Sequence, residues 1–452
     1  MPPFAARRPL LAAVLGGALS AAVVAVPGAP QEPLLRAVAS YDGDVPALPG
    51  VRVLEDLEAV GALVVEATPA GLTRLAGAPG VRGVSPDTAL VLTGAPAPSG
   101  GVLAADGLGG GAGRPGAGSG VRVAVIDTGV SDTAALTRAS GRLVDGWSWD
   151  DAFDDGYGHG TFMASVVAGG PVDGSDGDAV GVAPGATVVV VRVADDEGST
   201  SLSRVMAGLD WVATHADEVD VANLSFSHVR PGEAYGADPL VDAVARVRAA
   251  GVLAVVSAGN DRRVVGDPGF APEALTVGAA DLTGRRAAVA DFSGSGVAAG
   301  VRKPDVVASG VSVLGVLPAG SAVARAHTAA HVTGDLWRGS GTSQAAAVTS
   351  GAAALHLAAH PDDTPLQAKA ALRASTQQLP GQRDGAGLLL LDGDPRPAKG
   401  SGGRSGDPTG EAGFDANSWS ANSWSANSWS ANSWSANSWS ANSWSAAWGD
   451  GR

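Results

Sequence analysis

Three short segments carry a carboxylate, an imidazole and a hydroxyl in the order Asp, His, Ser. They are Val123–Gly129 with Asp127, Gly158–Thr161 with His159, and Gly339–Ala347 with Ser343. A serine hydroxyl becomes an effective nucleophile when a neighbouring imidazole removes its proton, and a carboxylate fixes the tautomer of that imidazole. The three residue types therefore predict acyl transfer through a covalent intermediate, as in a serine peptidase.

Each candidate residue lies where a secondary-structure element is expected to begin or end. The apolar residues 123–126 indicate a buried parallel strand, and Asp127 follows at its carboxyl end, where open α/β sheets gather functional groups. His159 stands between glycines and precedes the apolar run 162–168, which predicts a helix that begins near the imidazole. Ser343 opens an Ala-rich segment that predicts a long buried helix, whose positive N-terminal end favours negative charge on the hydroxyl oxygen.

Each segment alone also has a simpler structural interpretation. Asp127 suits a strand-to-turn junction, or one half of an aspartic-peptidase pair, although the sequence holds no second Asp-Thr-Gly or Asp-Ser-Gly segment. His159 suits a histidine at a helix start, and Ser343 suits a helix N-cap. The occurrence of all three in this order favours the catalytic interpretation.

Together, the segments Ile-Asp-Thr-Gly at 126–129, Gly-His-Gly-Thr at 158–161 and Ser-Gly-Thr-Ser at 340–343 resemble the motifs of the subtilisin-like serine peptidases. The similarity extends over about residues 121–391. The resemblance implies an α/β fold with a mainly parallel sheet and helices on both faces. It also implies an endopeptidase that acts on proteins or peptides and requires no cofactor for its chemistry.

The same resemblance implies further site residues. Asn260 follows the apolar run 252–257 and stands where the family places the amide donor of the oxyanion hole, with a turn-forming asparagine as the alternative. The implied substrate-binding residues are Ser225, Phe226 and Ser227 on one strand, Gly198 at the start of the opposite edge, and Gly259. Without the resemblance, the segment after Gly198 is an ordinary Gly/Ser loop.

Two segments depart from the family pattern. The family commonly continues after its serine with Met-Ala-Ala-Pro-His, whereas this chain has Gln344-Ala-Ala-Ala-Val348. Because alanine continues a helix more readily than proline, we expect the helix to remain intact. Glycine is usual where Ser227 stands, so its side chain is expected to narrow the pocket for the residue before the scissile bond.

Strand and helix patterns alternate after residue 121. Strands are expected at 187–193, 219–224 and 252–257, and helices at 202–215 and 239–250. This alternation predicts an α/β domain over 121–393 with right-handed crossovers. Residues 31–93 predict a small α+β unit that resembles the inhibitor-type propeptide of the family, and an unrelated N-terminal domain is the alternative. A Gly/Pro-rich segment, 94–120, is expected to be a flexible linker.

The N-terminus predicts export. Arg7, Arg8, the apolar stretch 10–26 and the small residues that follow it match a secretory signal over residues 1–30. An uncleaved membrane anchor and a twin-arginine signal are the alternatives. The chain contains no cysteine, which excludes disulfides and thiol catalysis. Its formal net charge of -15 argues against nucleic acid or an anionic membrane as the main partner.

The C-terminus is repetitive. A polar linker, 394–415, leads to a tail, 416–452, in which six copies of Ala-Asn-Ser-Trp-Ser occupy residues 416–445. A period of five matches neither a strand nor a helix face, so we expect a disordered tail. A β-solenoid coil and contact of the tryptophans with carbohydrate or a cell wall are the alternatives.

An acidic stretch contains Asp150, Asp151, Asp154 and Asp155. A solvated loop is the favoured interpretation, and a structural calcium site is the alternative. We therefore interpret the chain as a secreted serine endopeptidase, made as a precursor whose own propeptide inhibits it. The alternative is a catalytically silent subtilisin-fold protein attached to the cell surface through its Trp-rich tail. The intact triad and Asn260 argue against that alternative. Sedolisin-type acid peptidases carry Glu where this chain has His159, which excludes them.

Overall fold

The computed structural model describes residues 33–92, 95–96, 102–105, 108, 111–227, 238–262, 264–298, 300–381 and 383–391. The expected signal segment 1–30, the polar linker 394–415 and the repeat tail 416–452 lie outside these residues. From Leu34 onward, the described residues belong to one compact unit. None of the helices in this part of the chain is both long and apolar enough to cross a lipid bilayer.

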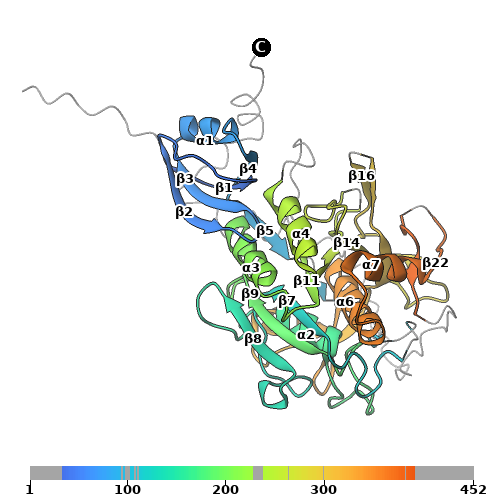
Figure 1. Cartoon of the computed structure of the whole chain (residues 1–452). Coiled ribbons are helices and arrows are strands. Elements are labelled where there is room, and N and C mark those ends of the chain that lie inside the picture. Colours follow the sequence, from blue (N-terminus) through green and yellow to red (C-terminus); the bar gives the residue numbers. More distant parts are fainter. Residues whose placement is uncertain are drawn as a thin grey trace, which may run out of the picture. The chain divides into compact units, whose positions relative to one another are not determined.

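A largely parallel sheet forms the centre of this unit (Figure 1). The strand order is β22-β23-β18-β14-β13-β11-β7-β9-β8, and β15 pairs with β14 outside this path. The strands are β7 (Arg122–Asp127), β8 (Leu143–Ser148), β9 (Thr187–Arg192), β11 (Val221–Leu224), β13 (Leu253–Ser257), β14 (Leu275–Asp281), β15 (Ala288–Val289), β18 (Val306–Ser309), β22 (Thr376–Gln377) and β23 (Leu388–Leu389). Among the described strands of this sheet, only β15 and β22 pair in antiparallel fashion.

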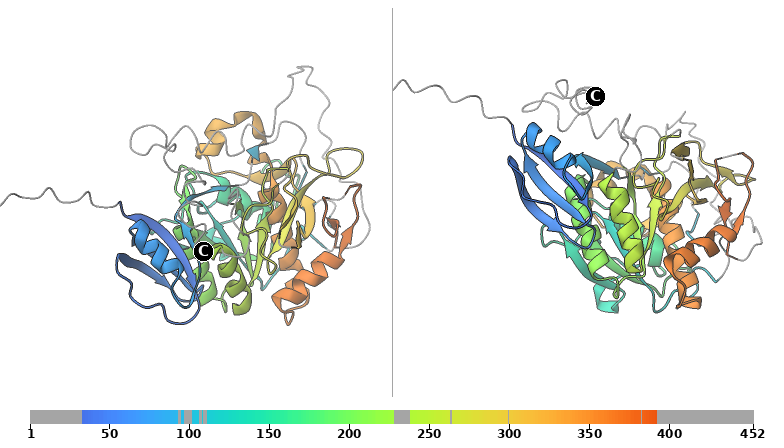
Figure 2. Two further views of the ribbon diagram at one scale, coloured as in Figure 1. Left: turned by 90° about the horizontal axis from the view of Figure 1, so that it is seen from above. Right: turned by 45° about the horizontal axis from the view of Figure 1, so that its top comes forward.

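Helices cover both faces of the sheet, as expected for the predicted fold class. On one face lie α2 (His159–Ala168) and α6 (Thr342–Ala359), with α7 (Pro365–Ala374) packed beside α6. On the other face α3 (Leu202–Thr214) and α4 (Pro239–Ala250) lie side by side (Figure 2). The departure from Pro to Ala after the serine leaves α6 continuous over its 18 residues.

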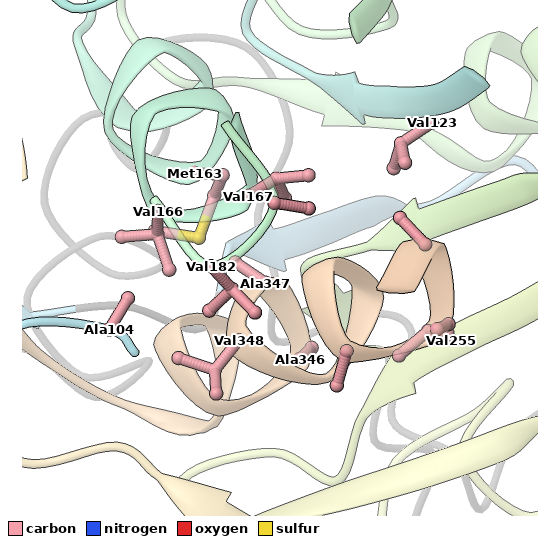
Figure 3. Packing of buried hydrophobic residues seen from close by; sticks show 14 of the residues in the cluster. Ala104, Val123, Met163, Val166, Val167, Val182, Val255, Ala346, Ala347 and Val348 are labelled. Atoms are coloured by element: carbon pink, nitrogen blue, oxygen red, sulfur yellow. The ribbon is translucent and has the colours of Figure 1, made fainter. Parts of the chain in front are cut away.

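The apolar residues of strand β7 pack against helices on both faces of the sheet. Val123 and Val125 belong to the core cluster that contains the buried residues of α2 and α6. Figure 3 shows residues of this cluster, among them Val123 of β7, Met163 of α2 and Ala347 of α6. Ala124 and Ile126 belong instead to the cluster formed with α3 and α4. Because successive strand residues face opposite sides, a strand between two helical layers must be apolar throughout.

Local sequence explains where the helices begin and end. The Ser201 hydroxyl accepts a hydrogen bond from the N–H of Arg204 at the start of α3, and Asp238 accepts one from Leu240 at the start of α4. Gly251 ends α4 in the left-handed conformation with φ 110°, which a residue with a Cβ rarely adopts.

Residues 35–86 form a separate antiparallel sheet in the order β2-β3-β1-β4, with one helix packed on it. These elements are β1 (Leu35–Tyr41), β2 (Val51–Leu57), β3 (Ala62–Ala67), α1 (Pro69–Ala76) and β4 (Val81–Pro86). The sheet contacts α3 and α4. Arg82 lies 2.8 Å from Asp242 of α4, and Arg246 of α4 donates to the backbone oxygen of Tyr41 at 2.8 Å.

The segment expected to be a flexible linker is partly packed. Ala104 and Leu108 are buried in the core cluster beneath α2 and α6. Val102 forms a parallel bridge with Val313, and the N–H of Gly113 donates to the Val182 oxygen at 2.7 Å. The described residues from Val102 onward therefore differ from the expected linker, because their few apolar side chains find a place in the core.

Smaller elements complete the described structure. They are β5 (Ala89–Leu92), β6 (Ala95–Pro96), η1 (Arg138–Ser140), β10 (Thr200–Ser201), β12 (Phe226–Ser227), β16 (Gly296–Ala298), β17 (Val301–Lys303), β19 (Val313–Val316), α5 (Ala322–Ala326), η2 (Thr328–Ala330), β20 (His331–Thr333) and β21 (Leu336–Ser340).

Candidate active site

Asp127 and His159 form a close pair. Asp127 is the last residue of β7, and His159 is the first residue of α2. The imidazole Nδ1 lies 2.8 Å from Oδ1 and 2.9 Å from Oδ2 of Asp127. Both residues are buried. Burial alone lowers the pKa of His159, but the charge and hydrogen bond of Asp127, together with the charge of Asp155, overcome this effect and raise it.

Ser343 lies in the first turn of α6, as the sequence predicts. Gly341 is the N-cap of this helix, so Ser343 is not the capping residue. The Ser343 hydroxyl donates to the backbone oxygen of Ser225 at 3.1 Å. Among the described residues, the Nε2 atom of His159 is buried without a hydrogen-bond partner. A buried nitrogen without a partner lowers the stability of the folded protein. Such an atom calls for an explanation, and a role in binding another group during function supplies one.

Asn260 is held by its amide oxygen. That oxygen accepts hydrogen bonds at 3.0 Å from both the N–H and the hydroxyl of Thr342, the residue before Ser343. The Thr342 hydroxyl in turn accepts from the N–H of Gly259 at 3.1 Å. These contacts fix the oxygen end of the amide, which leaves its NH2 group available to another acceptor. They tie Asn260 to α6 rather than to a local turn.

Strand β5 lies between the two segments implied as substrate-binding edges. The small sheet has the order β10-β5-β12, and both pairings are antiparallel. Leu92 pairs with Phe226 and Val91 with Ser227, while Leu90 pairs with Thr200. Ser225, Phe226, Ser227 and the edge after Gly198 thus surround a peptide segment of the chain itself, which demonstrates that an extended peptide fits between them.

The chain makes a second strand pairing close to Ser343 in sequence. Strand β6 pairs in antiparallel fashion with β21, with Ala95 opposite Ser340 and Pro96 opposite Gly339. Only residues 93 and 94, which lie outside the described residues, separate β5 from β6. The chain therefore pairs with β12, which follows the Ser225 oxygen that Ser343 contacts, and with β21, which ends at Ser340, shortly before Ser343.

Ser227 occupies the position where the family usually has glycine. It is buried, and its hydroxyl oxygen lies 3.2 Å from the point where a Cβ on Gly259 would stand. The Ser227 side chain therefore lies against Gly259, next to Asn260. Gly259 itself has φ 91°, a conformation that favours glycine. Gly198 has φ 78°, and a Cβ there would meet the ring of Tyr157 at 2.8 Å.

Asp155 belongs to the site in a way that the sequence analysis missed. Its carboxylate is buried and accepts hydrogen bonds from Thr128, next to Asp127, and from Thr161, two residues after His159. The position of Asp155, four residues before His159 and next to a glycine, was the available signal. From the sequence alone, Asp155 is only one member of an acidic stretch.

That acidic stretch is paired with arginines. Asp150 lies 3.5 Å from Arg192, and Asp154 lies 3.7 Å from Arg138. Among the described residues, no three His, Cys, Asp or Glu side chains gather as metal ligands would. Asp150, Asp151 and Asp154 are exposed, whereas Asp155 is buried.

Comparisons with known proteins agree with this geometry. The model of the subtilase family matches residues 118–393. The chain is 32% identical over 284 residues to the serine protease AprX of Bacillus subtilis (strain 168), covering 58% of this chain and 62% of AprX. It is 31% identical over 267 residues to subtilisin E of the same organism, again covering 58% of this chain and 62% of the relative. The chain thus spans less than two thirds of either relative.

A solved structure shares the fold. Fervidolysin from Fervidobacterium pennivorans, described as a keratinolytic enzyme related to subtilisin, matches with a TM-score of 0.61 at 24% sequence identity. The match covers 80% of this chain and 61% of fervidolysin. Because the family model covers more than half of the 452 residues, the chain belongs to the subtilase family.

Proposed function

We propose that the protein is a serine endopeptidase that hydrolyses peptide bonds of protein or peptide substrates through an acyl-enzyme on Ser343. The observation that carries this proposal is the pairing of an extended segment of the chain with both edges beside Ser343. Relatives named serine protease and subtilisin support the same reaction class. The silent-protein alternative gains no support from the site, because the Asp127–His159 contact is intact.

In the first step, the Ser343 oxygen attacks the carbonyl carbon of the scissile peptide while His159 Nε2 takes the hydroxyl proton. The Ser343 hydroxyl, which donates to the Ser225 oxygen at 3.1 Å, therefore turns its hydrogen toward the imidazole before the transfer. Asp127 accepts the Nδ1–H of His159, which fixes the tautomer that leaves Nε2 basic. Its charge also stabilises the imidazolium that forms.

The negative charge that develops on the carbonyl oxygen is stabilised by the NH2 group of Asn260 and by the positive end of α6. His159 then gives its proton to the leaving amine as the carbon–nitrogen bond breaks. A water molecule, deprotonated by His159, attacks the ester and releases the acid product. Ser343 regains its proton, so the cycle consumes one water for each peptide bond.

Residues 34–92 act as an inhibitory propeptide in this proposal. Their final strand, β5, fills the groove between β10 and β12 that a substrate would occupy. Strand β5 pairs with β12 as far as Leu92, and β6 pairs with β21 from Ala95 onward. The enzyme would therefore cut its own chain between Thr93 and Gly94, which agrees with the boundary expected from the sequence.

Export is part of the same proposal. The charged and apolar residues of the segment 1–30 support it, and so does a 34% identical relative named extracellular serine proteinase, from Thermus sp. (strain Rt41A). A propeptide that blocks the groove suits an exported peptidase, because it withholds activity until the chain has folded.

The test uses the full chain with Ser343→Ala. This substitution removes the nucleophile but no helix cap, so the variant is expected to fold and to accumulate as a soluble, unprocessed precursor. Wild-type protein should show a new N-terminus at Gly94 and label with a fluorophosphonate probe on Ser343. Wild-type enzyme added in trans should trim the variant. Self-processing of purified Ser343→Ala would refute the nucleophile, whereas a new N-terminus elsewhere would refute only the assigned bond.

A further inference from the structure

Asp155 is a buried carboxylate beside the candidate triad that takes no part in the proposed reaction steps. The residue is 2% exposed. Its Oδ1 accepts the Thr128 hydroxyl at 2.8 Å and the N–H of Gly158 at 2.6 Å. Its Oδ2 accepts the hydroxyl and the N–H of Thr161, both at 2.8 Å. Each carboxylate oxygen therefore binds one hydroxyl and one backbone N–H.

The first hydroxyl connects Asp155 to the segment that carries Asp127. Thr128 follows Asp127 directly, and its hydroxyl oxygen accepts the N–H of Gly160 at 2.9 Å while it donates to Asp155. The N–H of Thr128 donates to Asp127 Oδ1 at 2.9 Å. One threonine thus contacts the triad carboxylate, Asp155 and the residue after His159.

The second hydroxyl connects Asp155 to the helix that carries His159. Gly158 and Thr161 lie on either side of His159, so the carboxylate binds the first turn of α2 at two points. The N–H of Asp155 donates to the Ser131 hydroxyl at 2.9 Å, and the N–H of Ser131 donates to the Thr161 hydroxyl oxygen at 3.0 Å. These contacts close a ring between residues 127–131 and 155–161.

Only a carboxylate satisfies this ring. Backbone N–H groups cannot accept hydrogen bonds, and one of them faces each oxygen of Asp155. An asparagine in either orientation would place its NH2 group against the N–H of Gly158 or against that of Thr161. A buried donor left unpaired in this way destabilises the folded site.

Asp155 also acts on His159 through its charge. It is the second carboxylate, after Asp127, whose charge raises the pKa of His159. Asp196 accepts the N–H of the neighbouring Gly156, and the facing helix α5 contacts the backbone of residues 156–157. The other titratable or charged groups around this segment are Tyr157, Asp154, Arg192, Arg138 and, on α5, Arg325.

We propose that Asp155 is a positioning residue that fixes the Asp127 turn and the first turn of the His159 helix relative to each other. This inference rests on the proposed peptidase function. It assigns Asp155 no contact with substrate, so its loss should lower kcat while KM stays within about threefold.

The decisive variant is Asp155→Asn, compared with Asp154→Asn. Asp154 is the matched control, because its side chain is 84% exposed and lies outside the ring. Asp155→Asn should lower kcat/KM by about 10- to 100-fold and move the acid limb of the pH profile to lower pH by about half a unit or more. Asp154→Asn should keep kcat/KM within about twofold and leave the acid limb in place.

A second variant covers the case in which Asp155→Asn does not fold. Thr161→Val removes one hydroxyl from the ring but keeps the charge of Asp155. It should lower kcat by about 3- to 10-fold without moving the acid limb. An NMR titration of His159 in the inactive Ser343→Ala background gives the imidazole pKa independently of turnover, and Asp155→Asn should lower it.

The outcomes separate the two proposals. Loss of all activity in Ser343→Ala tests the nucleophile alone. If Asp155→Asn and Thr161→Val both retain wild-type kcat, or if Asp155→Asn leaves the pKa of His159 unchanged, the positioning role of Asp155 is wrong while the peptidase assignment stands.

Discussion

His159 illustrates how opposing effects set the chemistry of a single residue. Burial lowers the pKa of its imidazole, whereas Asp127 and Asp155 raise it, and the net direction is upward from 6.5. The protonated imidazole cannot accept the Ser343 proton. Because the folded protein raises the pKa of His159, the imidazole becomes protonated at a higher pH than a free histidine would. Activity should therefore be lost at that higher pH.

We therefore expect kcat/KM to fall as the pH drops through a single ionisation above 6.5. The measurement is the pH dependence of hydrolysis of an uncharged peptide substrate by the processed enzyme, with protein stability followed in parallel. An optimum near pH 4 would contradict the histidine mechanism and indicate acid-peptidase chemistry instead.

Ser227 sets a second prediction at the residue scale. Ser227 belongs to β12, which pairs with β5, and its hydroxyl lies against Gly259. Removal of the side chain should enlarge the space for the residue before the scissile bond, so Ser227→Gly should raise the rate on Phe relative to Ala by about threefold or more. Ser227→Ala removes the hydroxyl but keeps the Cβ atom, so it distinguishes the effect of the hydroxyl from that of the Cβ atom. An unchanged preference in both variants would remove Ser227 from the pocket.

At the scale of elements, the N-terminal sheet is linked to the first turn of α3. Asp87, which follows β4, accepts the N–H and the hydroxyl of Ser203 in the first turn of α3, at 2.8 and 2.7 Å. Arg36 of β1 lies 3.0 Å from the same carboxylate. A carboxylate at a helix N-terminus compensates both the unpaired N–H groups and the helix dipole.

Asp87→Ala should therefore weaken the binding of the propeptide to the enzyme by about 1 kcal/mol, which is about fivefold in the dissociation constant. The measurement is the lag before a fresh precursor preparation reaches full activity, which should become shorter. Glu66→Ala is the matched control, since Glu66 of β3 pairs with Arg52 of β2 inside the N-terminal sheet. Equal lags in all three proteins would show that the Asp87 contact does not limit release.

The elements themselves were predictable because their patterns are local. The helix expected after His159 ends at Ala168, and the helix expected over 202–215 occupies Leu202–Thr214. Segment 102–120 was not predictable in the same way. Its glycines and prolines indicate a linker. Ala104 and Leu108 are nevertheless buried, because they pack in a core cluster with residues that are distant in the sequence.

At the scale of the whole molecule, the described structure ends at residue 391, before the Trp-rich repeats. The polar linker 394–415 separates these repeats from the catalytic unit in sequence. Deletion of residues 416–452 should therefore leave kcat/KM for peptide hydrolysis within about twofold. The assay compares the truncated and full chains for soluble yield, processing at Gly94 and hydrolysis. Loss of active enzyme on truncation would show that the tail packs on the catalytic unit.

The sequence alone determined the residue types at the site and the local elements that carry them, because strand ends, helix starts and flanking glycines are encoded by neighbouring residues. Asp127, His159 and Ser343 could be named on that basis. Tertiary structure alone decided that β5 lies between β10 and β12, and that Asp155 joins the Asp127 and His159 segments. Both depend on hydrogen bonds between separate segments of the chain, such as that between Thr128 and Asp155, and these form only when the sheet and its helices pack together.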